Sequence, residues 1–210
     1  MAPSCQYRVL LACLSDSSCN AVDRYNYTSG WVDSQYKFSQ QFGRFDISAR
    51  LPGGNFCGIG SAHWLMPADN VCWPTGGEID IMEHWLCEQY GEVFGTLHYG
   101  PSCGNDTSTN YHGAYPDVAG GAQPIDFSAD FHVFSVEWDT EQISWFVDGN
   151  FYVQRYQNDT HGGGARIPQT AFYIILNTAI PWYYPAPQND WPTVFHVIDY
   201  VRVYQAAPSV

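Results

Sequence analysis

The chain has 210 residues and a formal net charge of −13, and 17% of its residues are aromatic while 14% are charged. This length predicts a single domain, residues 1–210, that is large enough to bury a full core. The acidic balance disfavours nucleic acids and anionic membranes as partners, and no apolar run approaches the roughly 18 residues of a membrane span.

Cysteines and glycosylation sequons indicate an oxidising compartment. The chain has 7 cysteines, none in the C-x-x-C spacing of zinc or redox sites. Asn-x-Thr sequons begin at Asn26, Asn105 and Asn158. We therefore expect a secreted protein. Residues 1–4 lack the basic and apolar regions of a signal peptide, as in a mature form with an added initiator methionine.

The disulfide pairing is predicted as follows, with other connectivities left open. Cys57–Cys72 would fasten the segment before an acidic strand, and Cys87–Cys103 the segment after it. Cys13–Cys19 would close a small N-terminal loop and leave Cys5 unpaired.

The first predicted elements are a strand at residues 5–12 and a polar turn at residues 16–20. Residues 42–52 alternate apolar and polar side chains and end with Pro52, which is typical of a strand.

Residues 76–85 carry the pattern on which the functional prediction depends. Glu78 to Ile81 alternate acid and aliphatic, the period of a half-buried strand. Glu83 has the wrong parity, but a β-bulge near Met82 returns it to the face of Glu78 and Asp80. The prediction is three carboxylates on one face, with Ile79 and Ile81 buried behind them.

An alternative is a solvated edge strand, in which alternating acids deter edge-to-edge pairing. The flanking Trp73-Pro74 and Trp85 argue against it, because tryptophans are unusual beside a merely solvated face. Retaining glycosidases need two carboxyl groups about 5–5.5 Å apart. Glu78 and Glu83 lie four strand steps apart once the bulge is discounted, about 13 Å, and two long side chains leaning inward can close most of that distance. Asp80 can hydrogen-bond one of them and bias where their protons reside.

The rest of the chain is predicted to form strands and one long surface excursion, a loop that leaves the sheets. A surface excursion is expected at residues 101–129, which are rich in Gly, Asn, Ser and Pro. Asp148-Gly149 predicts a hairpin turn, and Asn177 is a polar exception in an apolar central strand. Further strands are predicted at residues 93–100, 131–139, 142–148, 171–180 and 194–204.

The run Gly-Glu-Ile-Asp-Ile-Met-Glu (residues 77–83) resembles the catalytic signature of glycoside hydrolase family 16, in the bulged form E-x-D-x-x-E of its laminarinase-like branch. Similar stretches extend from about residue 28 to residue 205, and they include residues 27–34, 42–52, 59–67, 93–100, 131–138 and 194–204. The resemblance implies an all-β fold, an antiparallel two-sheet sandwich (jelly roll) with a concave substrate cleft. It also implies Glu78 as nucleophile, Asp80 as its electrostatic assistant and Glu83 as acid/base.

Sugar rings stack their C–H faces on aromatic side chains, so tryptophans near the acids are candidate substrate contacts. Trp64 and Asn177 have the alternative of a purely core role, and Trp31 stands where relatives often carry an arginine. Trp182 lies in a loop that departs from the family pattern. His98 belongs to a family-like L-H-Y-G stretch, which implies a role beside the acid/base Glu83. The expected substrate-binding set is Trp31, Trp64, Trp73, Trp85, His98, Asn177 and Trp182.

The N-terminal strand region is shorter than is usual in the family, which is the largest departure from its pattern. The resemblance implies no cofactor for catalysis, although some relatives bind a structural calcium ion, for which Asp199 would supply one ligand.

The predicted function is retaining endo-hydrolysis of β-1,3-glucan by double displacement, with a polysaccharide as the partner of a monomeric enzyme. Alternatives are transglycosylation, hydrolysis of another neutral polysaccharide (mixed-linkage glucan or agarose), and non-catalytic glucan recognition. Non-catalytic relatives have lost one or both glutamates, whereas this chain keeps Glu78 and Glu83.

Overall fold

The computed structural model describes residues 29–54, 58–86, 91–108, 112–158, 166–180 and 193–205. These residues form eleven strands and no helix, so none of the described segments is a helix that could span a membrane. The expected strand at residues 5–12, the Cys13–Cys19 bridge and Trp182 lie outside the described residues.

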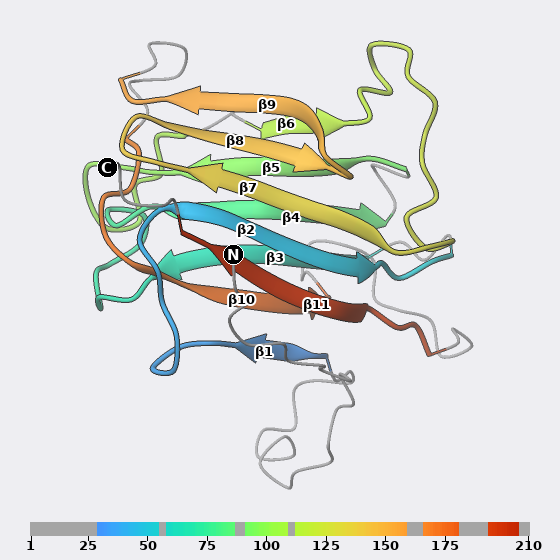
Figure 1. Ribbon diagram of the computed structural model, residues 1–210, viewed down its shortest axis with the longest axis horizontal. Helices are drawn as coiled ribbons and strands as arrows, with labels where there is room; N and C mark the ends of the chain where they lie inside the picture. Colours follow the sequence, from blue (N-terminus) through green and yellow to red (C-terminus); the bar gives the residue numbers. More distant parts are fainter. Residues whose placement is uncertain are drawn as a thin grey trace, which may run out of the picture.

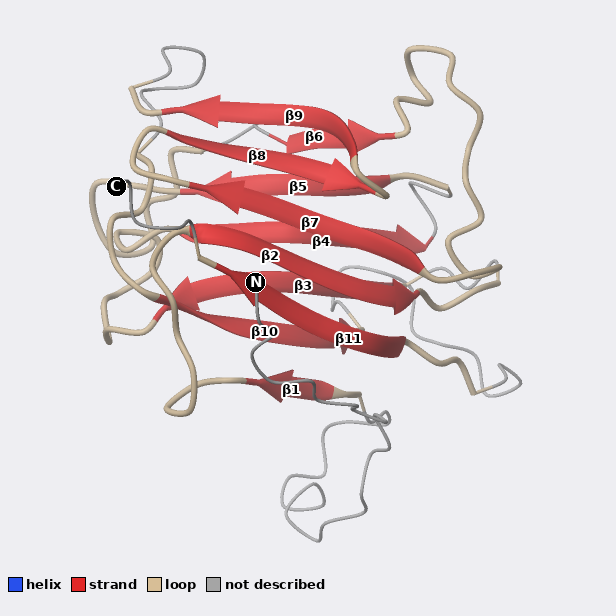
Figure 2. Ribbon diagram, in the orientation of Figure 1, coloured by secondary structure: helices blue, strands red, loops and turns tan. Residues whose placement is uncertain are grey.

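Two sheets stack face to face, and every pair of neighbouring strands is antiparallel (Figure 1, Figure 2). The six-stranded sheet contains, in spatial order, β1 (Trp31–Asp33), β10 (Phe172–Ala179), β3 (Ile59–Pro67), β4 (Glu78–Leu86), β5 (Val93–His98) and β6 (His112–Tyr115). The five-stranded sheet contains β11 (Val197–Tyr204), β2 (Gly43–Arg50), β7 (His132–Trp138), β8 (Gln142–Val147) and β9 (Asn150–Tyr156). The predicted antiparallel two-sheet sandwich is confirmed.

Alternation along the strands builds the core between the sheets. On β2, Phe45, Ile47 and Ala49 are each 0% exposed, while the residues between them point away from the core. On the opposite sheet, Leu65 and Ile79 are equally buried. Side chains from two inner faces that interdigitate in this way are the main source of stability in a sandwich.

The five-stranded sheet also contacts the backbone of the acidic strand directly. Trp145 of β8 is 1% exposed and donates its indole N–H to the carbonyl oxygen of Asp80 at 2.7 Å. Gly95 of β5 makes this approach possible, because a Cβ there would lie 2.4 Å from Cδ1 of Trp145. β4 is therefore held from behind by a hydrogen bond as well as by packing.

The turn prediction at Asp148-Gly149 is confirmed, since both residues have positive φ angles (51° and 78°) and Val147 pairs with Asn150.

The expectation of a plain surface excursion at residues 101–129 is wrong in part, because β6 lies within it and pairs with β5. Its four residues, His-Gly-Ala-Tyr, lack the alternation and β-branched side chains that mark a strand in sequence. β6 forms because β5 offers it an unpaired edge.

Three histidines lie in the core. His63, His84 and His196 are 0%, 4% and 8% exposed. Nε2 of His63 lies 2.9 Å from Nε2 of His196, and the two rings stack with centroids 5.0 Å apart. Burial lowers the pKa of His63 well below its usual value and those of His84 and His196 to about 4. All three are therefore neutral in the folded protein at neutral pH.

Candidate active site

The acidic strand β4 carries its three acids on one face because of a bulge. Its register with β5 pairs Glu78 with His98, Asp80 with Thr96 and Glu83 with Phe94, with a shift between Asp80 and Glu83. Since every second residue of β5 points the same way, the three acids share the face of those partners. Ile79, Ile81 and Met82 are at most 1% exposed on the core side. The predicted bulge is confirmed, and it absorbs one extra residue in the segment Ile81–Met82.

Asp80 lies at the centre of this face and is 3% exposed. Trp64 of β3 and Thr96 of β5 are its register partners on either side, and Nε2 of His98 lies 3.2 Å from its Oδ2. Burial and the charge of Glu83 raise the pKa of Asp80 to about 6. This environment excludes a solvated edge strand, because β4 is internal to its sheet and its middle acid is buried.

Glu78 is bonded by an indole from the preceding loop. Nε1 of Trp73 donates to Oε2 of Glu78 at 2.5 Å. Burial and the charge of Asp80 raise the pKa of Glu78 to about 8, while the positive charge of His98 and the Trp73 hydrogen bond act in the opposite direction. The Trp73 side chain, 40% exposed, lies next to this carboxyl group as the sequence predicted.

Glu83 has different partners. The Thr96 hydroxyl donates to Oε2 of Glu83 at 3.0 Å. Burial raises the pKa of Glu83, although hydrogen bonds from Thr96 and Trp85 and the charge of His98 oppose that shift. A raised pKa is the property that a general acid needs near neutral pH.

His98 supplies the positive charge of the site. Its Nδ1 lies 2.7 Å from Oδ2 of Asp106, and its Nε2 faces Asp80. Burial alone would lower the pKa of His98, but Asp80, Glu78 and Asp106 outweigh burial and raise it to about 10. His98 is therefore an imidazolium that is hydrogen-bonded to Asp106 through Nδ1 and forms an ion pair with Asp80 on its Nε2 side. Sequence placed His98 beside Glu83, whereas its register partner is Glu78 and its contact is with Asp80.

Ligand atoms of Glu78, Asp80 and His98 lie within 4.8 Å of one another, the one such grouping of three possible metal ligands in the described part of the chain. In this trio Nε2 of His98 lies 3.2 Å from Oδ2 of Asp80, a distance that fits an ion pair between an imidazolium and a carboxylate. Asp199 is far from this grouping in the fold. It is exposed, on β11 of the other sheet, where the register with β2 shifts.

Aromatic and amide side chains continue the same face beyond β4. The rings of Trp31 and Trp64 meet edge to face with centroids 5.4 Å apart. Trp64 donates its indole N–H to Oδ1 of Asn177 at 2.8 Å, which satisfies this oxygen and leaves the amide N–H groups to bond elsewhere. Asn177 pairs with Trp31 and with Ala62, so both neighbours place it on the site face.

Trp85 extends the face past Glu83. A Cβ on Gly60, its register partner on β3, would lie 2.0 Å from Cζ3 of Trp85. The indole ring therefore occupies the space that a Cβ at residue 60 would need, so only glycine fits there. Trp73 and Trp85 thus lie at the two ends of the acidic strand, one beside each glutamate.

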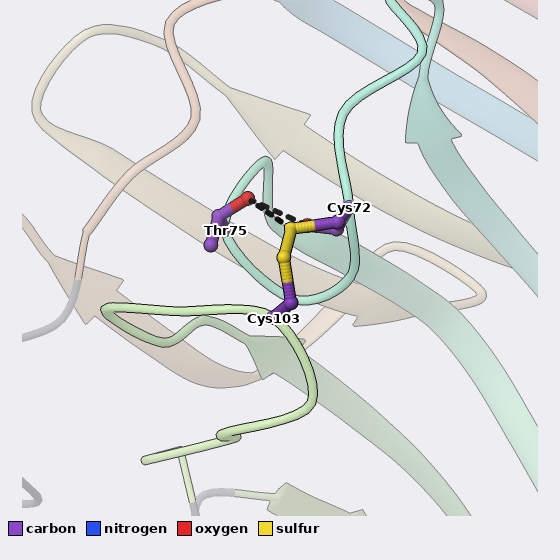
Figure 3. The surroundings of a disulfide bond; sticks show 3 residues. All are labelled: Cys72, Thr75 and Cys103. Carbon is purple, nitrogen blue, oxygen red and sulfur yellow. Dashed lines mark hydrogen bonds between the residues drawn. A yellow bond between two sulfur atoms is a disulfide. The ribbon is translucent and has the colours of Figure 1, made fainter.

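The disulfide in the described residues joins Cys72 to Cys103, with Cα atoms 5.4 Å apart (Figure 3). The predictions Cys57–Cys72 and Cys87–Cys103 are therefore wrong. β4 and β5 are antiparallel, so the segment before Glu78 and the segment after His98 meet at the same end of the sheet. The chain leaves β4 at Leu86, at the other end of the strand.

Two members of the site were missed from sequence, namely Thr96 and Asp106. Thr96 lies in the predicted strand at residues 93–100, two positions before His98, so its face was available from alternation. Asp106 lies in a loop, and no spacing rule connects it to His98. Its contact depends on how the loop folds back.

Paired glutamates on one face of an antiparallel sandwich, edged by tryptophans, define the class of carbohydrate-active β-sandwich proteins. The family model for glycosyl hydrolases family 16 matches residues 12–200. The chain belongs to this family, and the resemblance carried by residues 77–83 is confirmed at that level.

Two relatives and one solved structure agree with this family membership. The glucan endo-1,3-beta-glucosidase A1 of Niallia circulans is 34% identical over 197 residues, which cover 87% of this chain and 27% of that protein. The beta-glucanase of Rhodothermus marinus is 35% identical over 191 residues, which cover 85% of this chain and 63% of that protein. The laminarinase catalytic domain from Thermotoga maritima MSB8 superposes with a TM-score of 0.71 at 35% identity, covering 87% of this chain and 71% of that one. This chain thus spans less than two thirds of the length of these two curated relatives.

Proposed function

We propose that this chain cleaves β-1,3-glucan at internal bonds with retention of anomeric configuration. The observation that supports the proposal most is the bulge of β4, which gives Glu78, Asp80 and Glu83 a common face. A nucleophilic carboxylate and a proton-donating carboxyl group on one face are what a retaining glycosidase requires. The similarity to the endo-1,3-beta-glucosidase and the laminarinase named above supports β-1,3-glucan as the substrate class.

In the first step, the Glu78 carboxylate attacks the anomeric carbon while Glu83 passes its proton to the departing glycosidic oxygen. In the second step, Glu83, now ionised, takes a proton from water as that water attacks the same carbon, and the ester to Glu78 breaks. The raised pKa of Glu83, caused mainly by burial, supports its starting role as an acid. Burial and the charge of Asp80 raise the pKa of Glu78 to about 8, and the charge of His98 and the Trp73 hydrogen bond offset part of that rise in favour of the carboxylate.

Laminarin incubated with the enzyme and with Glu78→Ser tests this function. We expect shorter oligosaccharides whose first-formed reducing ends are β by proton NMR, and a loss of more than about a thousandfold in the variant. Longer oligosaccharides would indicate transglycosylation, in which a sugar hydroxyl replaces water. Glucan binding without any product would indicate a recognition protein. Unchanged hydrolysis by Glu78→Ser would overturn the catalytic assignment.

Two further expectations accompany this function. We propose an extracellular location, supported by the Cys72–Cys103 disulfide and by the exposed position of the Asn105 sequon. A calcium site that includes Asp199 stays a prediction. Its carboxylate is exposed at the bulge of β11, and calcium prefers six to eight oxygen ligands. A higher unfolding temperature in calcium than in EDTA would support the site, and identical temperatures would contradict it.

A further inference from the structure

We propose that Asp106 is a positioning residue that keeps His98 protonated and directed at Asp80, and thereby controls how protons are distributed among the carboxyl groups of β4. The proposal rests on the proposed function, because it concerns the same site. The contact that carries it is the 2.7 Å approach of His98 Nδ1 to Asp106 Oδ2, on the opposite side of the ring from Asp80 at 3.2 Å.

Asp106 is built as a fixed, ionised acceptor. The backbone N–H and the hydroxyl of Ser108 both donate to Oδ1 of Asp106, at 2.9 Å and 2.6 Å. This leaves Oδ2 for His98 alone among the described contacts. Burial would raise the pKa of Asp106, but the Ser108 and His98 hydrogen bonds outweigh burial and lower it. The carboxylate that faces His98 is therefore ionised over the whole working range of pH.

The loop that carries Asp106 is fastened to the loop that carries Trp73. Cys103 is bonded to Cys72 (Figure 3). The N–H of Gly104 donates to the carbonyl oxygen of Trp73 at 2.8 Å. On the other side of Asp106, the N–H of Thr107 donates to the carbonyl oxygen of Tyr99 at 2.9 Å. A loop held at both ends can keep a short aspartate side chain in place with little further loss of entropy.

The charged groups that face His98 come from two elements. Glu78, Asp80 and Glu83 lie on the neighbouring strand β4, and Asp106 lies in the loop after β5. The neutral neighbours of His98 are Trp73 and Ser108. The ring centroids of Trp73 and His98 are 5.9 Å apart, and Oγ of Ser108 lies 3.2 Å from Nδ1 of His98. Glu78 and Asp80 must change protonation or contacts during the reaction, whereas Asp106 is not one of the three acids on β4. Asp106 is thus the partner that holds the imidazolium constant through both steps.

Asp106→Asn tests the proposal, because it removes the negative charge while retaining size and an oxygen acceptor. We expect His98 to lose its proton at a lower pH, so that the alkaline limb of the kcat/KM profile on laminarin moves down by about one pH unit or more. We also expect kcat near pH 10 to fall about fivefold while KM stays within about twofold. Asp106→Glu, which restores the charge, should recover part of the profile.

Asp126→Asn is the matched control. Asp126 accepts from the backbone N–H and hydroxyl of Ser128 at 3.0 Å and 2.6 Å, the same local arrangement, but it does not contact His98. This variant should keep the wild-type profile, so a shift confined to Asp106→Asn separates positioning of His98 from loss of a loop hydrogen bond. An unshifted profile in Asp106→Asn would overturn the proposal.

NMR of ¹⁵N-labelled histidine tests the proposal without any activity. His98 should be doubly protonated at pH 8 in the wild-type enzyme, and in Asp106→Asn it should lose its proton at a pH lower by about one unit or more. A neutral His98 at pH 8 in the wild type, or the same titration in both proteins, would overturn the proposal even if one variant folded poorly. If the wild type hydrolysed no glucan but its His98 titrated as expected, the proposed function would fail while the role of Asp106 stood.

Discussion

At the scale of single residues, the site gives chemically similar carboxyl groups different partners. Glu78 receives an indole N–H from Trp73, Glu83 receives a hydroxyl from Thr96, and Asp80 faces the imidazolium. Burial and mutual repulsion raise the pKa of Glu78 to about 8. Because the proposed nucleophile must be ionised, kcat/KM should rise with pH through a value above the 4.5 of an ordinary glutamate.

Trp73→Phe tests how far the indole N–H favours the ionised form of Glu78. The variant keeps the aromatic ring but loses the N–H that stabilises the carboxylate, so the pKa of Glu78 rises further and the acid limb of kcat/KM moves to higher pH. At pH 6 we expect a loss of about fivefold, corresponding to about 1 kcal/mol for one hydrogen bond to a partly exposed charged group. The measurement is the pH profile of laminarin hydrolysis.

Trp31→Phe is the control for Trp73→Phe. It also removes an indole N–H, but one that is bonded to Asp33 at 2.8 Å, so its acid limb should coincide with that of the wild type even if KM changes. An acid limb that does not move in Trp73→Phe would contradict the assigned hydrogen bond.

At the scale of elements, β4 performs two tasks on its two faces. Its outer face carries the acids, and its inner face carries His84 among core side chains, with Phe127 in edge contact at 6.1 Å. Nδ1 of His84 has no hydrogen-bond partner in the described residues. A buried histidine of this kind is stable only while neutral, so it links the fold of the acidic strand to pH.

His84→Phe should make the protein less sensitive to acid. The folded pKa of His84, lowered by burial to about 4, is below its unfolded value of 6.5, so its contribution is complete above pH 6.5 and is lost as the pH falls toward 4. Between pH 7 and pH 4, the wild type should therefore lose about 3 kcal/mol more free energy of unfolding than the variant. Urea unfolding at several pH values measures both slopes, and parallel slopes would contradict this burial effect.

At the scale of the whole molecule, the net charge of −13 comes from 21 acidic and 8 basic residues. Such a surface repels polyanions at long range, and this repulsion is screened beyond about 10 Å at 0.1 M salt. Neutral glucans do not experience this repulsion. Charge thus acts on substrate choice independently of the contacts in the site.

Activity on a panel of laminarin, lichenan, agarose and carrageenan tests the influence of net charge on substrate choice. We expect the fastest release of reducing sugar from laminarin and little from the sulfated carrageenan. Raising the salt concentration should leave laminarin hydrolysis nearly unchanged, because laminarin is uncharged. Activity confined to agarose or carrageenan would overturn β-1,3-glucan as the substrate class.

Much of the fold and the row of acids were predictable because both depend on local patterns. The alternation around Ile79 and the odd parity of Glu83 together required a bulge, and the bulge is present. β6 was not predictable, since its four residues have no strand pattern and pair only because β5 has an open edge. The disulfide was mispredicted because each predicted bridge fastened one segment beside the acidic strand, whereas antiparallel pairing brings Cys72 to Cys103.

The sequence by itself determined the sandwich, the face of the three acids and the family, because strand periodicity and a short motif are carried by neighbouring residues. Only the tertiary structure decided what surrounds those acids. Asp106 reaches His98 from a loop that Cys72 and Trp73 hold in place, and Trp145 bonds the backbone of Asp80 from the other sheet. Protonation depends on burial and on charges a few ångströms away through space, and residues distant in sequence provide both.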